Sequence, residues 1–202
     1  MAGTTWDERY TGEDYLFGTA PNAFLAREVH RLRRGQRVLA VADGEGRNGV
    51  FLAERGLDVA SLDSSAVAQE KARKLATARG VPLHLMLADL DGYAWPEAAY
   101  DAVVGIFIQF AAPPFRAQLF KGMQQALRPG GLLLLEGYRP EQLAYGTGGP
   151  PHAENLYTEA MLRDAFAAGM QIVSLSSYDA PIEEGAGHSG MSALIDLIAV
   201  KL

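Results

Sequence analysis

The chain has 202 residues, of which 49% are hydrophobic and 21% charged, with a formal net charge of -6 and no cysteine. This length favours one globular domain over residues 1–202, and the acidic balance argues against a nucleic-acid partner. The absence of cysteine excludes disulfide bonds, thiolate metal sites and cysteine nucleophiles, and four scattered histidines give no pattern of metal ligands, so no metal is expected.

Short apolar segments alternate with helical ones, which predicts an α/β fold with a doubly wound, mainly parallel, seven-stranded sheet. Residues 1–34 are expected to form an N-terminal lid and a helix from about Pro21 to Leu32, and residues 35–202 a Rossmann-like core. In the first half of this core the predicted strands are 37–41, 58–62 and 82–87, and the predicted helices are 46–56 and one from Ser64 or Ser65 to Gly80.

The second half of the chain continues the alternation. Residues 102–108 are almost unbroken apolar, as in a strand buried on both faces. A helix from Pro113 is expected next, which ends at the turn Arg128-Pro129-Gly130-Gly131, followed by a strand at 132–138 and a loop at 139–155. A helix from Thr158 to Phe166 comes after this loop. The last two strands are expected at 170–176 and 192–201, with a glycine-rich loop at 183–190 between them. Because about fifteen residues without a helix join the last two strands, the final strand must run antiparallel to its predecessor.

A glycine loop, Gly44-Glu45-Gly46-Arg47-Asn48-Gly49, follows the first strand and opens a helix, with Asp63 about twenty residues further on. This spacing matches the dinucleotide-binding pattern. Asp43 and Glu45, however, place two carboxylates where a pyrophosphate would bind, and these would repel it. The same acids suit a ligand with an ammonium and a sulfonium group and no phosphate, such as S-adenosylmethionine. A tight turn that serves only strand–helix packing is the alternative.

The segment Val38-Leu39-Ala40-Val41-Ala42-Asp43-Gly44-Glu45-Gly46-Arg47-Asn48 resembles motif I of the class I S-adenosylmethionine-dependent methyltransferases. Ala40 stands where that motif usually has an acid, and Ala42 where it usually has a glycine, so Asp43 is the candidate substitute for the usual contact to the methionine amine. Three further segments resemble the small bacterial group related to tellurite-resistance and thiopurine methyltransferases: Trp6-Asp7-Glu8-Arg9-Tyr10, Phe17-Gly18-Thr19-Ala20-Pro21-Asn22 and Gly185-Ala186-Gly187-His188-Ser189-Gly190.

The resemblance implies how a bound cofactor is held. Asp63 would accept hydrogen bonds from both ribose hydroxyls, Asp89 and the amide of Leu90 would bind adenine, and Phe17-Gly18 would form the lid. The alternatives are a helix cap at Asp63, a solvated loop acid at Asp89, and an N-terminal segment that only packs on the sheet. The complete predicted cofactor set is Phe17, Gly18, Asp43, Gly44, Glu45, Gly46, Asp63, Ser64, Asp89, Leu90 and Ile106.

The candidates for the acceptor side follow from topology. Ligands of an open parallel sheet lie beyond the carboxyl ends of its strands, and the loop that carries His188 is expected to overhang that edge. His188 is therefore a candidate proton acceptor or anion anchor, and a solvated loop residue is the alternative. Tyr138 and Tyr145, with Phe107, are candidate walls of an acceptor pocket, although aromatic residues at strand ends also serve as core. The other histidines, expected to be structural or surface residues, are His30, His84 and His152.

Together these features predict methyl transfer from S-adenosylmethionine to a small molecule, with a thiol or a chalcogen oxyanion implied by the resemblance. No apolar run approaches the ~18 residues of a membrane span and the first ten residues are too polar for a signal peptide, so we expect a cytoplasmic monomer or homodimer without a membrane partner. The altered motif leaves open a non-catalytic protein that senses S-adenosylmethionine, and the glycine pattern leaves open a nicotinamide-dependent oxidoreductase.

Overall fold

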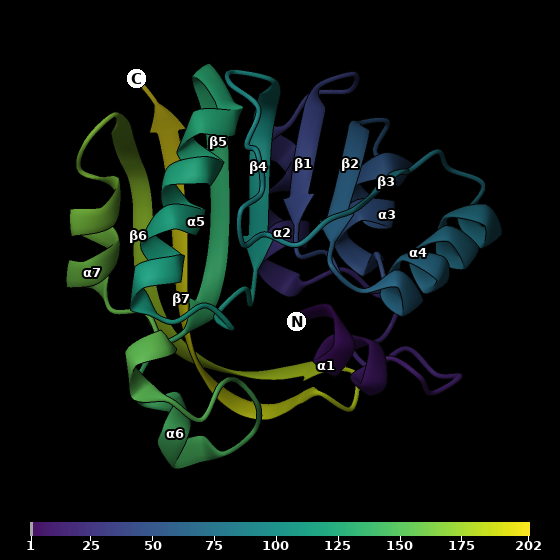
Figure 1. Ribbon diagram of the computed structural model, residues 1–202. Coiled ribbons are helices and arrows are strands. Elements are labelled where there is room, and N and C mark those ends of the chain that lie inside the picture. The colour runs from purple at the N-terminus through teal and green to yellow at the C-terminus, as the bar shows by residue number, and fades with distance from the viewer. Residues whose placement is uncertain (1) are drawn as a thin grey trace. The chain divides into compact units, whose positions relative to one another are not determined.

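The computed structural model describes residues 2–202, with side chains from Trp6 onward, and divides into two compact units. The first comprises Met1–Ala94 and Glu184–Gly187, and the second Trp95–Glu183 and His188–Leu202. Each unit contains its own set of neighbouring strands, ordered β3-β2-β1 in the first and β4-β5-β7-β6 in the second (Figure 1).

The first unit is built on three parallel strands. Leu39 of β1 lies opposite Ala60 of β2, and Leu62 of β2 lies opposite Met86 of β3. The side chains of β1 and β2 are almost all buried, as strands covered on both faces require. The elements of this unit are α1 (Ala2–Arg9), α2 (Ala23–Glu28), η1 (Val29–Arg31), β1 (Arg37–Val41), α3 (Arg47–Glu54), β2 (Asp58–Asp63), α4 (Ala66–Arg79) and β3 (His84–Leu87).

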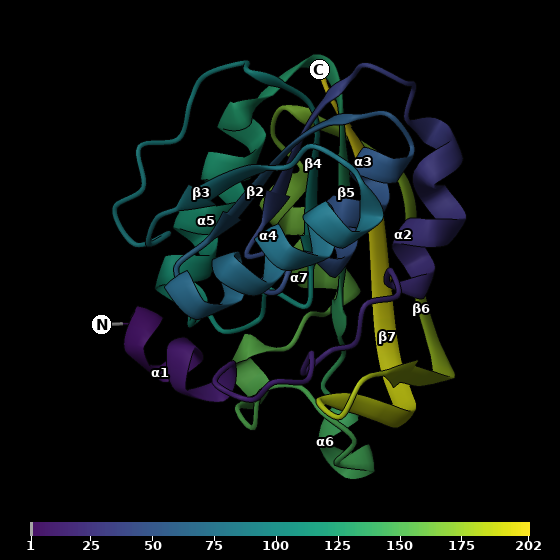
Figure 2. The same ribbon diagram turned by 90° about the vertical axis from the view of Figure 1, so that its right-hand side faces the viewer.

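The second unit combines a parallel and an antiparallel pair. β4 pairs with β5 in parallel and β5 with β7 antiparallel, with Leu134 opposite Ile198. Helices α5 and α7 lie on the same face of these strands, as the two views in Figures 1 and 2 show. The elements are β4 (Tyr100–Ile106), α5 (Pro113–Ala126), β5 (Leu127–Tyr138), α6 (Gln142–Tyr145), η2 (Ala153–Asn155), α7 (Glu159–Phe166), β6 (Met170–Glu184) and β7 (His188–Lys201).

The strand order confirms the predicted fold class: an α/β arrangement of seven strands that is mainly parallel and has an antiparallel last strand. The caps that define several helices are also those predicted. Ser65 accepts a hydrogen bond from the amide of Ala68 at the start of α4, and Thr158 accepts one from the amide of Met161 at the start of α7.

Several predicted boundaries are wrong, and two of them have a clear local cause. The helix expected from Pro21 begins two residues later, because the side chain of Asn22 accepts a hydrogen bond from the amide of Leu25 and caps it. The strand expected to reach Ile108 ends at Ile106, because Phe107 adopts a left-handed φ of 55° that an extended strand does not permit.

The C-terminal hairpin is longer than predicted. β6 continues to Glu184 and β7 begins at His188, so only three residues of the expected loop at 183–190 lie between the strands. His188 is therefore part of a strand, with 8% of its surface exposed, and is not a residue of a solvated loop. The predicted turn at 128–131 lies within β5, at an irregularity where the register with β4 shifts between Tyr100 and Ala102.

Ala42 ends the first strand in a conformation that normally favours glycine. Its φ is 48°, in the left-handed region, at the position where the resembled motif has glycine. A β-carbon in this region costs roughly 1–2 kcal/mol for an L-residue. The chain therefore carries backbone strain directly before its glycine loop.

Replacing Ala42 by glycine should relieve this strain. We expect Ala42→Gly to raise the free energy of unfolding by about 0.5–1 kcal/mol, because the relieved strain exceeds the entropy that glycine adds to the unfolded chain. Ala78→Gly, in an exposed part of α4, is the matched control and should lower it by about 0.5–1 kcal/mol. Urea unfolding measures both, and destabilisation of similar size in both variants would contradict strain at Ala42.

Candidate functional site

The glycine loop of the first unit depends on two left-handed glycines. Gly44 and Gly46 have φ values of 57° and 83°, which glycine adopts without strain. A β-carbon on Gly46 would lie 2.6 Å from the β-carbon of Ala72 in α4, so this glycine also lets the helix approach. The loop thus presents backbone, without side chains, at both positions.

Asp63 at the end of β2 is fixed against this loop. Its Oδ2 accepts a hydrogen bond from the Gly44 amide at 2.8 Å, and its Oδ1 accepts one from the Ser65 amide at 2.8 Å. Burial raises the pKa of the carboxyl, although the amides of Ser65, Gly44 and Ser64 act against this rise. Because Ser65 caps α4, Asp63 does not serve as the cap of that helix. The carboxylate is held in one orientation by backbone donors.

The two acids at the glycine loop, Asp43 and Glu45, contact other groups of the protein. Asp43 Oδ1 accepts from the Gly49 amide at 3.1 Å, and its Oδ2 accepts from Ser61 Oγ at 2.7 Å. Glu45 Oε1 lies 2.7 Å from Lys71 Nζ. Glu45, predicted together with Asp43 to repel a pyrophosphate, is therefore paired with a lysine inside the protein. Both acids brace the loop from inside.

The N-terminal segment covers this loop. Tyr10 is 5% exposed, and a β-carbon on Gly44 would lie 2.9 Å from its hydroxyl. Its ring stacks on Trp6 at a centroid distance of 5.7 Å and meets the edge of Phe17 at 6.3 Å. Tyr10 thus packs on the glycine loop itself. The role of Phe17 and Gly18 as a cofactor lid stays a prediction.

Polar contacts hold the same segment in place. Ser65 Oγ donates to Asp7 Oδ1 at 2.5 Å, which joins the end of α1 to the start of α4. The Leu16 amide donates to Glu45 Oε2 at 2.8 Å, and Lys71 Nζ donates to the carbonyl of Asp14 at 2.8 Å. The buried pair of Glu45 and Lys71 therefore links the glycine loop, α4 and the chain between α1 and α2.

The tip of the hairpin returns to the N-terminal segment within the first unit. The Gly187 amide donates to the carbonyl of Leu16 at 3.1 Å, and a β-carbon on Gly185 would lie 2.6 Å from the Gly18 nitrogen. Glu184 Oε1 accepts from Asn22 Nδ2 at 2.9 Å. Backbone approaches this close require glycine, so the two segments that carry the family resemblance are brought together.

Arg47 and Glu184 form a buried ion pair that the sequence did not indicate. Arg47 Nη2 lies 2.5 Å from Glu184 Oε2, with side-chain exposures of 8% and 7%. Beside this pair, the Asn22 amide donates to Asn48 Oδ1 at 2.9 Å. All four residues lie within or next to segments that resemble the family, Arg47 and Asn48 in the segment resembling motif I and Asn22 and Glu184 in or beside two others. The pairing of Arg47 with Glu184 across 137 residues has no local signature.

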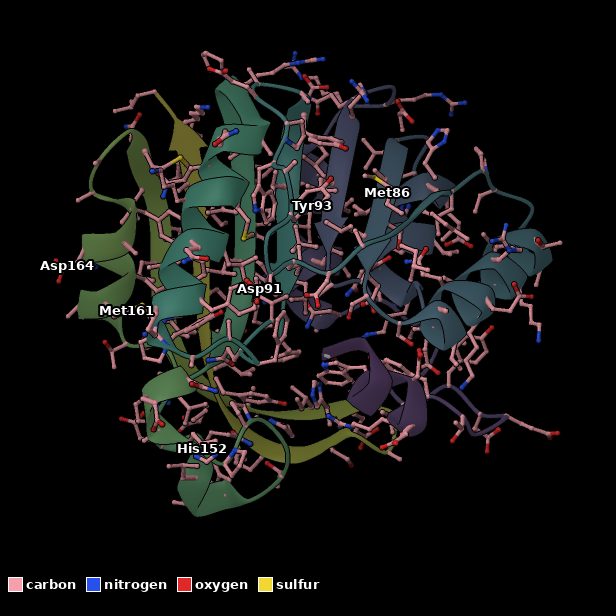
Figure 3. The ribbon with its side chains drawn as sticks, in the orientation of Figure 1. Met86, Asp91, Tyr93, His152, Met161 and Asp164 are labelled. Carbon is pink, nitrogen blue, oxygen red and sulfur yellow. The ribbon has the colours of Figure 1, made fainter. Side chains whose placement is uncertain are left out.

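The segment after β3 carries the predicted adenine residues. The Ala88 amide donates to the carbonyl of Asp63 at 3.0 Å, so this chain passes directly beside the end of β2. Asp89 is exposed and accepts from the Asp91 amide at 3.0 Å, whereas Leu90 is buried. Figure 3 labels Asp91 on this segment. Asp63, Asp89 and Leu90 therefore lie on adjacent strand ends, as predicted from topology.

The second unit brings three aromatic rings together. Phe107 stacks on Tyr138 at a centroid distance of 4.5 Å, and His188 meets both rings edge-on, at 4.6 Å from Phe107 and 5.6 Å from Tyr138. The left-handed backbone of Phe107 directly follows Ile106, the last residue of β4. Gln109 accepts from the Tyr138 amide at 2.6 Å and donates to the Tyr138 carbonyl at 2.8 Å. The imidazole is thus held by aromatic contacts at strand ends.

Tyr145 has a different environment. It is 39% exposed on α6 and donates to Asp179 Oδ2 at 3.0 Å, a bond that raises its pKa. The structure therefore places its hydroxyl on Asp179 of β6 and not on the His188 ring. The other histidines lie as expected: His84 pairs with Asp58 at 3.0 Å on the surface, and the exposed residues are His30 and His152, the latter labelled beside α6 in Figure 3.

Neither a metal cluster nor a membrane span is found in the described part of the chain. Within residues 2–202, no three side chains of histidine, aspartate or glutamate come together as ligands for a metal ion. No helix in the same range is long and apolar enough to cross a membrane.

Comparisons with known proteins agree on one domain type. Residues 38–131 match the family model described as a methyltransferase domain. Protein-L-isoaspartate O-methyltransferase of Methylorubrum populi is 34% identical over 131 residues, which cover 61% of this chain and 61% of that relative. The chain thus spans less than two thirds of the length of that relative.

Solved structures show the same fold over nearly the whole chain. A protein studied for the conversion of a disulfide bond into a thioacetal group during echinomycin biosynthesis superposes with a TM-score of 0.81 at 22% identity, covering 100% of this chain and 92% of that one. TehB from Haemophilus influenzae superposes with a TM-score of 0.73 at 16% identity, covering 99% of this chain and 67% of that one.

Asp43 should make stability depend on pH. Burial raises its pKa from 3.8 to about 7, so between these values the folded protein holds a proton that the unfolded chain releases. The free energy of unfolding should therefore fall as pH rises through this window, by up to about 1.4 kcal/mol per pH unit. Asp43→Asn, which keeps hydrogen-bonding atoms but does not titrate, should flatten this slope.

Urea unfolding at a series of pH values measures the slope. Asp89→Asn removes an exposed carboxylate nearby and is the matched control, which should keep the wild-type slope. Equal slopes for the wild-type protein and Asp43→Asn would show that Asp43 is already ionised throughout this range.

Proposed function

We propose that the protein transfers the methyl group of S-adenosylmethionine to a small-molecule acceptor. The observation that carries this proposal is the Asp63 carboxylate, fixed by the amides of Gly44 and Ser65 beside a loop without side chains. A carboxylate held in this way can accept charge-assisted hydrogen bonds from two ribose hydroxyls. The match of residues 38–131 to a methyltransferase domain supports the predicted enzyme class and cofactor.

The residues of the first unit fit this cofactor. Gly44 and Gly46 present backbone, Asp63 would hold the ribose, and Asp89 with the amide of Leu90 would hold the adenine. When bound, the cofactor supplies an electrophilic methyl group on a sulfonium. Phe17 and Gly18, which pack on the hairpin tip, would shield it from water.

We assign the proton-accepting role to His188. An in-line displacement needs alignment and exclusion of water more than an enzyme nucleophile, so a base is required only to remove a proton from the acceptor. Imidazole is suited to this at neutral pH. Phe107 and Tyr138 restrict the ring of His188 by their contacts with it. Because Tyr145 is bonded to Asp179, the proposal includes His188 and Tyr138 but not Tyr145.

For the acceptor we propose a thiol or a chalcogen oxyanion. The aromatic rings of Phe107 and Tyr138 offer polarisable surface suited to a soft nucleophile. The neighbour studied for conversion of a disulfide bond into a thioacetal group supports a sulfur acceptor, whereas the relative in Methylorubrum populi is named for a protein acceptor. The net charge of -6 speaks against RNA. We place the activity in the cytoplasm, in a monomer or homodimer.

Ligand-dependent melting tests the cofactor. S-adenosylhomocysteine should raise the melting temperature, since a ligand at ~100 times its dissociation constant stabilises the folded state by ~2.7 kcal/mol. NAD should give no shift, because its two phosphates would have to sit beside the carboxylate of Asp63. An equal shift with NAD would favour a nicotinamide oxidoreductase instead.

Turnover tests the role of His188 and separates catalysis from sensing. His188→Gln, which keeps a similar size but cannot accept a proton at neutral pH, should leave cofactor affinity within about twofold and reduce turnover by ~10²-fold or more. His152→Ala, on the surface, is the matched control. If His188→Gln keeps the turnover of the wild-type protein, alignment and exclusion of water are the whole mechanism. If the wild-type protein binds the cofactor but methylates no acceptor in a broad screen, the protein is a sensor.

A further inference from the structure

The side chain of Gln109 pairs with β5 at the point where the backbone of β4 leaves it. The amide of Phe107 still donates to the carbonyl of Glu136 at 2.9 Å, but Phe107 adopts a left-handed φ of 55° and ends the strand. Two residues later, Gln109 Oε1 accepts from the amide of Tyr138 at 2.6 Å, and Gln109 Nε2 donates to the carbonyl of Tyr138 at 2.8 Å. The side-chain amide thus takes the place of a peptide group of β4.

Hydrogen bonds fix the orientation of this amide. Gln109 is 2% exposed, and its Nε2 also donates to the carbonyl of Asn155 at 3.4 Å. A turned amide would place its N–H groups against the amide of Tyr138 and its oxygen against two carbonyls. The carbonyl of Tyr138 also accepts from the amide of Tyr157 at 2.9 Å. Both backbone groups of Tyr138 therefore have fixed partners.

Gly137 leaves the space that the amide occupies. A β-carbon on Gly137 would lie 2.8 Å from Cδ of Gln109 and 2.7 Å from a ring carbon of Tyr157. The backbone of Gly137 is not in the left-handed region, so its conformation does not require glycine. The close approach of the Gln109 side chain does require it. Residues of β5 and of the chain after β4 thus fit one another at this contact.

The contact lies between the two residues whose rings touch His188. Phe107 stacks on Tyr138 at a centroid distance of 4.5 Å, and the imidazole meets both rings edge-on. The left-handed conformation of Phe107 is strained, and such strain persists only where the surrounding structure imposes it. Gln109 ties the chain that follows Phe107 to the backbone of Tyr138, so its hydrogen bonds maintain both the turn and the stack.

We propose that Gln109 is a positioning residue for the acceptor side of the site. Its amide fixes the backbone of Tyr138 beside that of Phe107, and the two stacked rings hold the imidazole of His188 in one direction. The inference rests on the proposed function, in which His188 accepts a proton from the acceptor. Gln109 itself takes no part in proton transfer, because a neutral amide does not titrate.

Proton NMR of the histidine rings tests this positioning without any ligand. Aromatic rings shift the resonances of protons that lie against them, so those of His188 should differ from those of the exposed His30 and His152. The resonances lost in His188→Gln assign the ring. Gln109→Met keeps a similar side-chain length without the amide, and the His188 resonances should then move toward those of the exposed histidines.

Two further variants make the comparison specific. Gln124→Met removes another glutamine amide, one that donates to the carbonyl of Ala165 at 3.3 Å, and this matched control should leave the His188 resonances unchanged. Gly137→Ala keeps Gln109 but places a β-carbon 2.8 Å from its Cδ, which displaces the amide. It should shift the same resonances in the same direction, and it serves in place of Gln109→Met if that variant does not fold.

Kinetics and calorimetry measure what the positioning does, with 2-mercaptoethanol and selenite as probe acceptors. Because a displacement of about 1 Å can cost ~10²-fold in rate, Gln109→Met should lower kcat about 10- to 100-fold. The affinity for S-adenosylhomocysteine should stay within about twofold, since the bonds of the Gln109 amide run to residues 138 and 155 of the second unit. Gln124→Met should keep both values.

Each outcome can be assigned. Unchanged His188 resonances in Gln109→Met would overturn the inference, whatever the turnover. Shifted resonances with wild-type kcat, or a loss of cofactor affinity as large as the loss of kcat, would also overturn it and leave the proposed function intact. A wild-type protein that methylates neither probe would count against the proposed acceptor class, and the NMR comparison would still decide whether Gln109 holds the ring of His188.

Discussion

The buried ion pair of Arg47 and Glu184 is the contact on which the candidate cofactor site depends. Its side chains are 8% and 7% exposed, so removing either partner would leave an uncompensated charge inside the protein, which typically costs about 3–5 kcal/mol. Through this pair the start of α3 is joined to the hairpin tip, and through Asn22 both are joined to the N-terminal segment. Three parts of the chain that are distant in sequence therefore share one charged centre.

A second buried pair, Glu45 and Lys71, does the same on the other side of the loop, where it holds Leu16 and the carbonyl of Asp14. Asp43 and Glu45, the acids next to the glycines, thus form their hydrogen bonds and ion pair within the protein. The groups that the proposed function assigns to the cofactor are the backbone at the two glycines and the oriented carboxylate of Asp63.

Features that depend on neighbouring residues in the sequence, such as helix caps and buried strands, could be predicted. Features that depend on contacts between distant residues could not. Ser65 and Thr158 act as caps through their own side chains, and the apolar run before Phe107 forms the buried strand that it predicted. The ion pair of Arg47 has no local signature, because its partner Glu184 lies 137 residues away in the sequence. The strands of the hairpin extend further than predicted, to a tip whose contacts with Leu16 and Gly18 join residues far apart in the sequence.

A crystal structure of the protein with S-adenosylhomocysteine is the most direct test of the account. The central claim is that Asp63, held by the amides of Gly44 and Ser65, receives the ribose of the cofactor. The account predicts both ribose hydroxyls within hydrogen-bonding distance of the Asp63 carboxylate, about 2.5–3.0 Å between oxygens. A ligand bound elsewhere, or a ribose turned away from Asp63, would contradict it.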